Sequence, residues 1–293
     1  MSGGLINDPP RLAPETARHA IARLPISQPY PSTMQTGEPT RTQAKPEKRA
    51  EASIQARSVA VWDLPTRLFH WSLVILVAFS WFSFQYSESL KDPVLKYHRW
   101  AGLLVLTLLV WRLLWGVFGS STSRFKAFLP GPKKVTSYAS AMLSGREPKY
   151  LGHNPLGALM IFALLGLLIV QATLGLFSVE HNDLTAGPLY RFISEAGRKE
   201  ATSWHVFLFE TVTLWLIGLH ILANVFYALF RGEPLTKAML TGHKPKRDYA
   251  DAQTADIAAR PLLRATILLA LSAIIVFGGI WAVGGKFLQM RLW

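Results

Sequence analysis

The chain has 293 residues, of which half are hydrophobic and none is cysteine. The lack of cysteine excludes structural disulfides, iron–sulfur clusters, cysteine-bound zinc and the C-x-x-C-H attachment of c-type haem. The net charge of +13 lies largely in loops between apolar stretches, so we expect membrane lipid as its partner and no nucleic acid.

Residues 1–57 precede the first apolar stretch and differ from the rest of the chain. They hold eight of its 18 prolines, many polar residues and no sustained apolar periodicity, which predicts a disordered cytoplasmic tail. No continuous apolar core of a secretory signal occurs in them. A partner-binding tail is one interpretation; a spacer, or a translation start at Met34, is the simpler one.

Five apolar stretches follow, each long enough to cross a membrane as a helix of roughly 20 residues. Asp63, with Pro65 in the first turn, is the expected cap of the first helix, and Asn154 that of the third. A short interfacial helix is expected over residues 132–144, where apolar side chains recur at helical spacing beside two lysines. The predicted spans cover residues 68–86, 97–118, 155–177, 203–230 and 262–283.

Basic residues are divided unevenly between the connecting loops. The loops after the second and fourth spans hold six Lys or Arg residues each, whereas the loops on the other side hold two and three. Loops rich in Lys and Arg are typically cytoplasmic. We therefore expect a multi-pass protein of the cytoplasmic membrane, with its N-terminus in the cytoplasm and its C-terminus in the periplasm.

Two of the chain's histidines, His205 and His220, share the fourth span. A histidine inside a membrane is costly and is therefore a functional-site hypothesis. On a regular helix their separation of 15 positions corresponds to a rise of about 22 Å and a net rotation of about 60°. One side of a single helix would then present an imidazole near each face of the membrane.

Depth in the membrane pairs these histidines with two others. His98, at the start of the second span, matches His205 at the outer face, and His70, in the first span, matches His220 at the inner face. Each pair comes from two helices, as a bis-imidazole haem inside a bundle requires. A zinc or copper site would gather its ligands around one centre, which the rise along the fourth span forbids for all four. The pattern predicts two non-covalent haems.

Other polar residues near the spans have more than one interpretation. Arg67 and Arg99 are placed to meet haem propionates, although snorkelling or capping also explains them. Glu210 could move protons, contact a quinone or bond a neighbouring helix. Asn224, one turn beyond His220, could orient that site or bond between helices. Arg112, near the inner end of the second span, is expected to snorkel.

Several short segments also occur in a characteristic order. They are V-W-D-L-P-T-R-L-F-H-W at 61–71, H-R-W-A-G at 98–102, Y-L-G-H-N-P-L-G-A at 150–158, Q-A-T-L-G-L-F at 171–177, and W-H at 204–205 followed by His220. Over roughly residues 60–245 the chain resembles the bacterial cytochrome b561 and nickel–iron hydrogenase b-type cytochrome family.

The resemblance implies an all-α integral membrane protein of the bacterial inner membrane: a four-helix haem-binding transmembrane bundle, here with a fifth C-terminal transmembrane helix. The expected organisation is a tail (1–57), a dihaem cytochrome b domain (58–245), and a cytoplasmic linker with the fifth helix (246–293). The four histidines would be the axial ligands of two haem b groups. His153 would be structural or would contact a propionate.

The resemblance also implies a role in the respiratory chain, with electrons passing between quinone and a protein partner. The leading hypothesis is a dihaem cytochrome that exchanges electrons with a periplasmic c-type cytochrome, hydrogenase or molybdenum enzyme; no residue is assigned as catalytic. A self-contained superoxide:quinone oxidoreductase is an alternative, with outer cations steering the anion. These cations are Lys91, Lys96, Arg99, Arg191, Arg198 and Lys199. A haem-free transporter or membrane scaffold is an alternative of another class.

Overall fold

The computed structural model describes residues 57–86, 93–179 and 186–287. The chain divides into two units, Met1–Lys45 and Pro46–Trp293. The first unit, and with it most of the predicted tail, lies outside the described residues, as do the loop residues Lys91 and His181. The fold below is that of the second unit.

Five helices of the described residues are long and apolar enough to cross a membrane, which confirms the predicted all-α membrane fold. Large apolar side chains such as Ile75, Trp215 and Trp281 are exposed on their surfaces, as expected where lipid is the solvent. The helices are α2 (Leu64–Gln85), α4 (Pro93–Phe118), α7 (Pro155–Phe177), the continuous run α8 (Glu195–Phe207), η3 (Leu208–Thr213) and α9 (Leu214–Phe230), and the run α11 (Pro261–Ala273), η4 (Ile274–Gly278) and α12 (Gly279–Ala282).

The predicted caps are present. The Asp63 carboxylate accepts a hydrogen bond from the Thr66 N–H at 2.8 Å, and the Asn154 side chain accepts one from Gly157 N–H at 2.7 Å. The fourth spanning helix begins at Glu195, earlier than the predicted residue 203, because Ser194 caps a polar first turn. Hydropathy alone cannot place such a start, because the polar turn extends beyond the apolar stretch.

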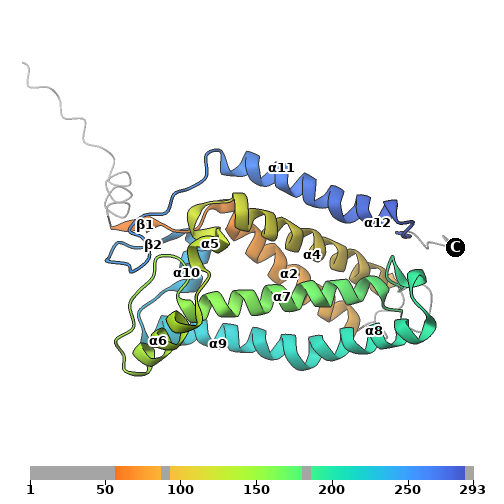
Figure 1. Ribbon diagram of the computed structural model, residues 1–293, viewed down its shortest axis with the longest axis horizontal. Coiled ribbons are helices and arrows are strands. Elements are labelled where there is room, and N and C mark those ends of the chain that lie inside the picture. Colours follow the sequence, from red (N-terminus) through yellow and green to blue (C-terminus); the bar gives the residue numbers. More distant parts are fainter. Residues whose placement is uncertain (1–56, 87–92, 180–185, 288–293) are drawn as a thin grey trace, which may run out of the picture. The chain divides into compact units, whose positions relative to one another are not determined.

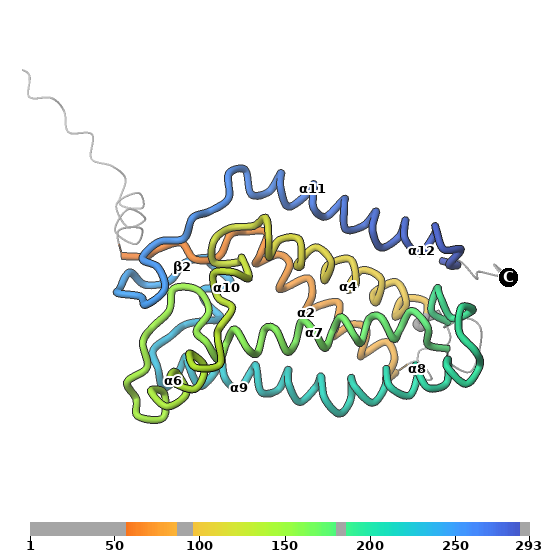
Figure 2. Tube along the Cα trace, in the orientation of Figure 1, coloured from red at the N-terminus to blue at the C-terminus, as the bar shows by residue number. Residues whose placement is uncertain are grey.

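Helix α4 is the centre of the bundle and packs against α2, α7 and α11. Leu109 of α4 and Leu165 of α7 share one buried cluster, while Leu103 of α4 and Val276 of η4 share another. The run α8–η3–α9 packs against α7 instead. Figures 1 and 2 accordingly show α11 and α9 along opposite edges of the bundle, with α4 and α7 between them.

One end of the bundle is covered by a cap of short elements. Strand β1 (Ser58–Ala60) pairs antiparallel with β2 (His243–Pro245), with Val59 opposite Lys244. The remaining cap elements are η1 (Ser121–Ser123), α5 (Phe125–Phe128), α6 (Pro132–Leu143), which is the expected short helix, and α10 (Leu235–Thr241). The end of the bundle that carries this cap is called the cap end below, and the other the far end.

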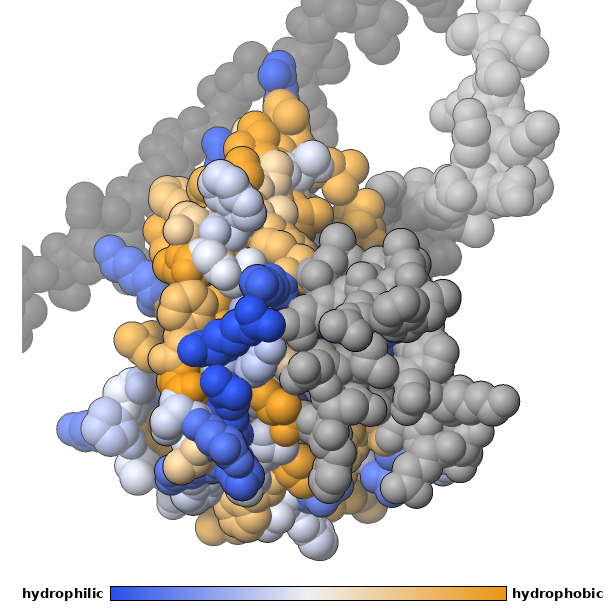
Figure 3. Space-filling model, turned by 90° about the vertical axis from the view of Figure 1, so that its right-hand side faces the viewer, coloured by the Kyte–Doolittle hydropathy of each residue, from blue (hydrophilic) through white to orange (hydrophobic). Residues whose placement is uncertain are grey.

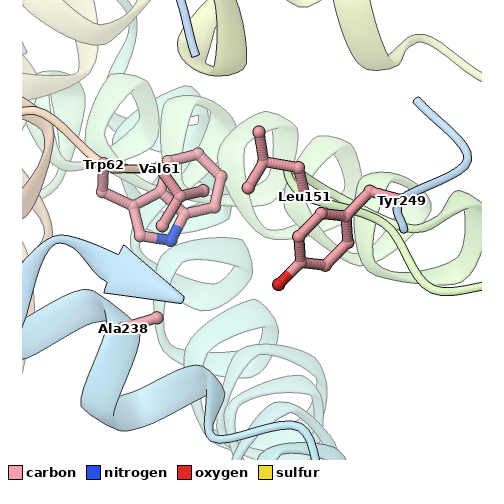
Figure 4. Close-up of a cluster of buried hydrophobic side chains, with 5 residues drawn as sticks. All are labelled: Val61, Trp62, Leu151, Ala238 and Tyr249. Atoms are coloured by element: carbon pink, nitrogen blue, oxygen red, sulfur yellow. The ribbon is translucent and has the colours of Figure 1, made fainter. Parts of the chain in front are cut away.

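The cap has a hydrophobic core of its own. Val61, Trp62, Leu151, Ala238 and Tyr249 come together from four separate segments of the chain, as Figure 4 shows. The same segments also form hydrogen bonds beside the two strands. The carbonyl oxygen of Gly242, directly after α10, accepts hydrogen bonds from the backbone N–H groups of Val61 and Trp62. The cap thus ties the start of the first spanning helix to the segment after the fourth.

Candidate functional site

The structure brings His98 of α4 and His205 of α8 together at the far end of the bundle. Their ring centroids lie 6.1 Å apart and their planes are at 84°. A metal–imidazole bond is about 2 Å long, so two axial imidazoles on one iron have ring centres separated by about 6 Å. The spacing of this far-end pair is therefore suited to an iron between the rings.

Backbone carbonyls of two other helices orient these rings. His98 Nδ1 lies 2.8 Å from the Ser80 carbonyl oxygen of α2, and His205 Nδ1 lies 2.9 Å from the Gln171 carbonyl oxygen of α7. When Nδ1 donates to a carbonyl oxygen, Nε2 is left to bind a metal, an arrangement typical of histidine ligands. The Gln171 side-chain amide also donates to the His205 carbonyl oxygen at 2.8 Å. This bond between α7 and α8 therefore holds a candidate ligand in place.

Open space lies on both sides of the far-end pair. Two mostly apolar cavities of about 660 and 720 Å³ share His98, His205, Gly102 and Ala172 in their walls. A Cβ on Gly102 would meet no atom of the described chain within 4 Å, so this glycine borders open space. The far-end pair thus fits a large flat macrocycle held between two imidazoles.

Gly175 of α7 makes room for the His205 ring. A Cβ at this position would lie 3.0 Å from His205 Cε1 and 3.4 Å from Nδ1. Even a Cβ there would require the imidazole to shift by a few tenths of an ångström, because real Cβ contacts are seldom this short. The small residue is therefore part of the site.

His70 of α2 and His220 of α9 form the cap-end pair. The two imidazoles are close enough to interact electrostatically. Within the described chain His70 Nδ1 is buried without a hydrogen-bond partner, and the ring packs edge-on against Trp71 at 5.0 Å. The Asn224 amide donates to the His220 carbonyl oxygen at 2.7 Å and lies 3.3 Å from Nε2. A buried ring nitrogen without a partner, close to a second imidazole, is compatible with a metal-bound pair, in which a metal at His220 Nε2 would replace the Asn224 contact.

The helix between His205 and His220 is not regular, contrary to expectation. The π-helical segment η3 accommodates one extra residue. The 15 positions from His205 to His220 therefore correspond to about 14 positions of a regular α-helix. The rise between the two residues is about 21 Å, and their net rotation is about 40°, opposite in sense to the rotation expected for a regular helix. The fully buried Thr213 donates to the Leu208 carbonyl oxygen within this turn. Both rings still face one side of the helix, through a different geometry.

The two arginines expected at propionates donate to backbone carbonyls. Arg67 Nη1 bonds the Leu240 carbonyl oxygen at the end of α10. Arg99 Nη1 and Nη2 bond the carbonyl oxygens of Ala186 and Phe287, at 3.3 and 2.8 Å. The Nε atoms of both side chains are buried and have no hydrogen-bond partner in the described part of the chain. Each arginine therefore has a buried Nε–H without a partner in the described chain, and Arg99 also borders the larger cavity.

Arg112 does not snorkel, so that expectation is wrong. It is 5% exposed and its guanidinium lies 4.7 Å from the centre of the Phe125 ring. His153, just before α7, packs between Trp62 and Phe128 with ring centroids 4.6 and 4.5 Å away. Burial, together with nearby Arg112, holds the pKa of His153 well below its ordinary value. His153 is thus packed between aromatic rings of the cap.

Hydrophilic side chains gather in a stripe across the far end of the unit (Figure 3). Two of the cations expected to steer an anion there have local partners. Arg198 Nε donates to the Tyr190 carbonyl oxygen at 2.8 Å, and Lys199 pairs with Glu195 at 2.9 Å. Glu210, in η3, lines the smaller of the two cavities but is exposed. These contacts give the superoxide alternative no specific support.

Comparison with known proteins identifies the family of the chain. A family model described as prokaryotic cytochrome b561 matches residues 61–242, more than half of the chain. The probable Ni/Fe-hydrogenase B-type cytochrome subunit of Rhodobacter capsulatus is 26% identical over 226 residues, which cover 67% of this chain and 85% of the relative. No solved structure is detectably similar.

Proposed function

Because the chain belongs to the prokaryotic cytochrome b561 family and is a multi-pass membrane b-type cytochrome of electron transfer, we propose that it binds two haems and carries electrons across the bacterial inner membrane. One end of this path would exchange electrons with the quinone pool and the other with a periplasmic redox protein. The observation that carries the proposal is the 6.1 Å spacing of His98 and His205, with both rings oriented by backbone carbonyls.

The far-end pair would hold the periplasmic haem and the cap-end pair the cytoplasmic one. The basic loops at the cap end support this orientation, with the N-terminus in the cytoplasm and the C-terminus in the periplasm. Two observations support a second haem. His220 lies on the same helical run as His205, and His70 and His220 are close enough to interact electrostatically. Arg67 and Arg99 would each offer the remaining Nε–H to a propionate.

Each haem supplies reversible one-electron chemistry when bound. The chain contributes the rest: four imidazoles for ligation, the Ser80 and Gln171 carbonyls for orientation, and apolar walls that exclude water. A single helix, α8–η3–α9, would fix the separation of the two centres at about 21 Å along its axis. A rigid shared helix keeps that separation constant while electrons pass.

The partner is proposed from the relative whose name states a hydrogenase subunit. A hydrogenase is one periplasmic candidate, and a c-type cytochrome or a molybdenum enzyme is another. A self-contained superoxide:quinone oxidoreductase would turn over without any protein partner, and a haem-free transporter would purify without haem. Reduction of quinone by the isolated chain, with superoxide as the electron donor, would distinguish the first alternative from the partner-dependent function.

The experiment that tests the proposal is a count of haem per chain, with reduced-minus-oxidised spectra, for the wild type and two histidine variants. We expect two b-type haems in the wild type, and one each in His205→Ala and His220→Ala, with different spectra left behind. His243→Ala, which alters an exposed cap histidine, is the matched control and should keep both. Equal loss of both haems from either stably inserted variant would contradict separate sites.

A further inference from the structure

A polar pocket at the cap end takes no part in the proposed electron path. It lies where α6, the segment before α7 and the end of α9 meet. Its walls include Glu147, Lys149, Tyr227, Arg231, Glu233 and Lys244.

The pocket is built around charged side chains that are almost fully buried. The side chains of Lys244, Glu233 and Glu147 are 2%, 8% and 10% exposed. The Glu233 carboxylate receives Arg247 at 2.9 Å, Lys149 at 3.3 Å and Lys244 at 3.9 Å. One carboxylate therefore faces three cations.

The remaining charges do not balance this excess. Arg231 and Glu147 form a pair at 3.2 Å, and the Asp251 carboxylate accepts hydrogen bonds from the backbone N–H groups of Leu151 and Gly152. Four cations and three carboxylates leave one positive charge. Lys149, whose side chain is 40% exposed, is the most accessible of these cations, so one added negative charge beside it would balance the cluster.

One buried acceptor also lacks a donor. In the described structure Glu147 Oε2 has no hydrogen-bond partner, whereas Oε1 of the same carboxylate pairs with Arg231 Nε. The nearby Tyr138 hydroxyl is engaged with Tyr227 at 3.2 Å, and burial raises the pKa of Tyr138 well above its ordinary value. A complementary ligand would combine an anion for the cations with a hydroxyl or similar donor for Glu147.

Apolar side chains beside the pocket place it at the membrane surface. Leu143 at the end of α6 is 86% exposed, and Leu229 and Phe230 at the end of α9 are 72% and 73% exposed. Tyrosines line the pocket at this depth, as is typical of the membrane interface. Basic pockets between helices at such a depth commonly receive lipid headgroups.

We propose that this pocket binds the headgroup of an anionic phospholipid with a glycerol head, such as phosphatidylglycerol. The phosphodiester would meet Lys149 and Arg231, a glycerol hydroxyl would donate to Glu147, and the acyl chains would cover Leu143 and the end of α9. Phosphatidylethanolamine has a donor but no net charge, and phosphatidylcholine has neither.

Native mass spectrometry of the haem-loaded protein, released from micelles with defined lipid, tests this proposal. We expect the wild type to retain phosphatidylglycerol in preference to phosphatidylethanolamine and phosphatidylcholine. Lys149→Gln should weaken retention about fivefold, the effect of one cation near a lipid phosphate. Glu147→Gln should reduce the preference for phosphatidylglycerol over phosphatidic acid, which lacks the glycerol hydroxyls.

Lys237→Gln, an exposed cation of α10 outside the pocket, is the matched control and should retain lipid as the wild type does. Unchanged haem content verifies that each variant is folded. Equal retention of phosphatidylglycerol and phosphatidylcholine, or no effect of Lys149→Gln, would overturn the proposal. Full competition by soluble glycerophosphoglycerol at equal concentration would overturn the membrane source and assign the site to a free phosphodiester.

Discussion

The far-end and cap-end histidine pairs use one common helix but differ in what orients their rings. Both Nδ1 atoms of the far-end pair contact backbone carbonyls of helices that supply no ligand to that pair. At the cap end, His220 contacts Asn224 of its own helix, and His70 Nδ1 has no hydrogen-bond partner among the described residues. The packing of the bundle itself therefore fixes the far-end rings, whereas the cap-end rings depend more on what they bind. Three substitutions test this contrast.

The largest effect is expected from Gly175→Leu. A side chain at this position would displace the His205 ring, whose Cε1 atom would lie 3.0 Å from the new Cβ. We expect haem per chain to fall from two to one, with the spectrum of the cap-end haem retained.

Gly166→Leu is the matched control for this change. It lies in the same helix, and a Cβ there would meet nothing of the described chain within 4 Å. Two haems in Gly175→Leu would show that the His205 ring does not need its present position.

A smaller effect is expected from Gln171→Leu. This change removes the side-chain bond to the His205 carbonyl oxygen but leaves the backbone carbonyl that orients the ring. Loss of a supporting group of this kind typically weakens metal binding by 10–100-fold, so we expect haem loss from the far end to accelerate by about tenfold. Transfer of haem to apomyoglobin measures the rate, and Thr173→Ala, exposed on the same helix, is the control. A rate equal to that of the control would remove Gln171 from the site.

The smallest effect is expected from Asn224→Ala. Iron at His220 Nε2 would replace the 3.3 Å contact with Asn224, so the loaded protein would lose only the bond to the His220 carbonyl oxygen. Both haems should remain, with loss rates within about a factor of two of the wild type. A loss as large as that of Gln171→Leu would show that the cap-end ring is oriented as firmly as the far-end one.

Much of the bundle could be predicted from the sequence, because hydropathy and capping residues are local signals. The five spans and the Asp63 and Asn154 caps are of this kind. The pairing of His98 with His205 followed from depth, and the structure brings these rings together; their role as ligands stays a prediction.

The cap could not be predicted, because its core residues come from distant segments without periodicity. The burial of Arg112 could not be predicted for the same reason, because the Phe125 ring that covers its guanidinium belongs to a separate helix of the cap. The carbonyl that orients His98 belongs to Ser80, and any residue type could supply a carbonyl. No feature of the sequence marks this contact.

The π-helical segment between His205 and His220 affects how relatives of this chain should be aligned. Because η3 absorbs one residue, a homologue with a spacing of 14 and an uninterrupted α-helix would present its histidines with nearly the same geometry. An ungapped alignment of two such chains would match only one of the two histidines. A single-residue gap placed within residues 208–213 would restore both. In this chain the segment 208–213 is therefore where a one-residue difference in histidine spacing would be absorbed.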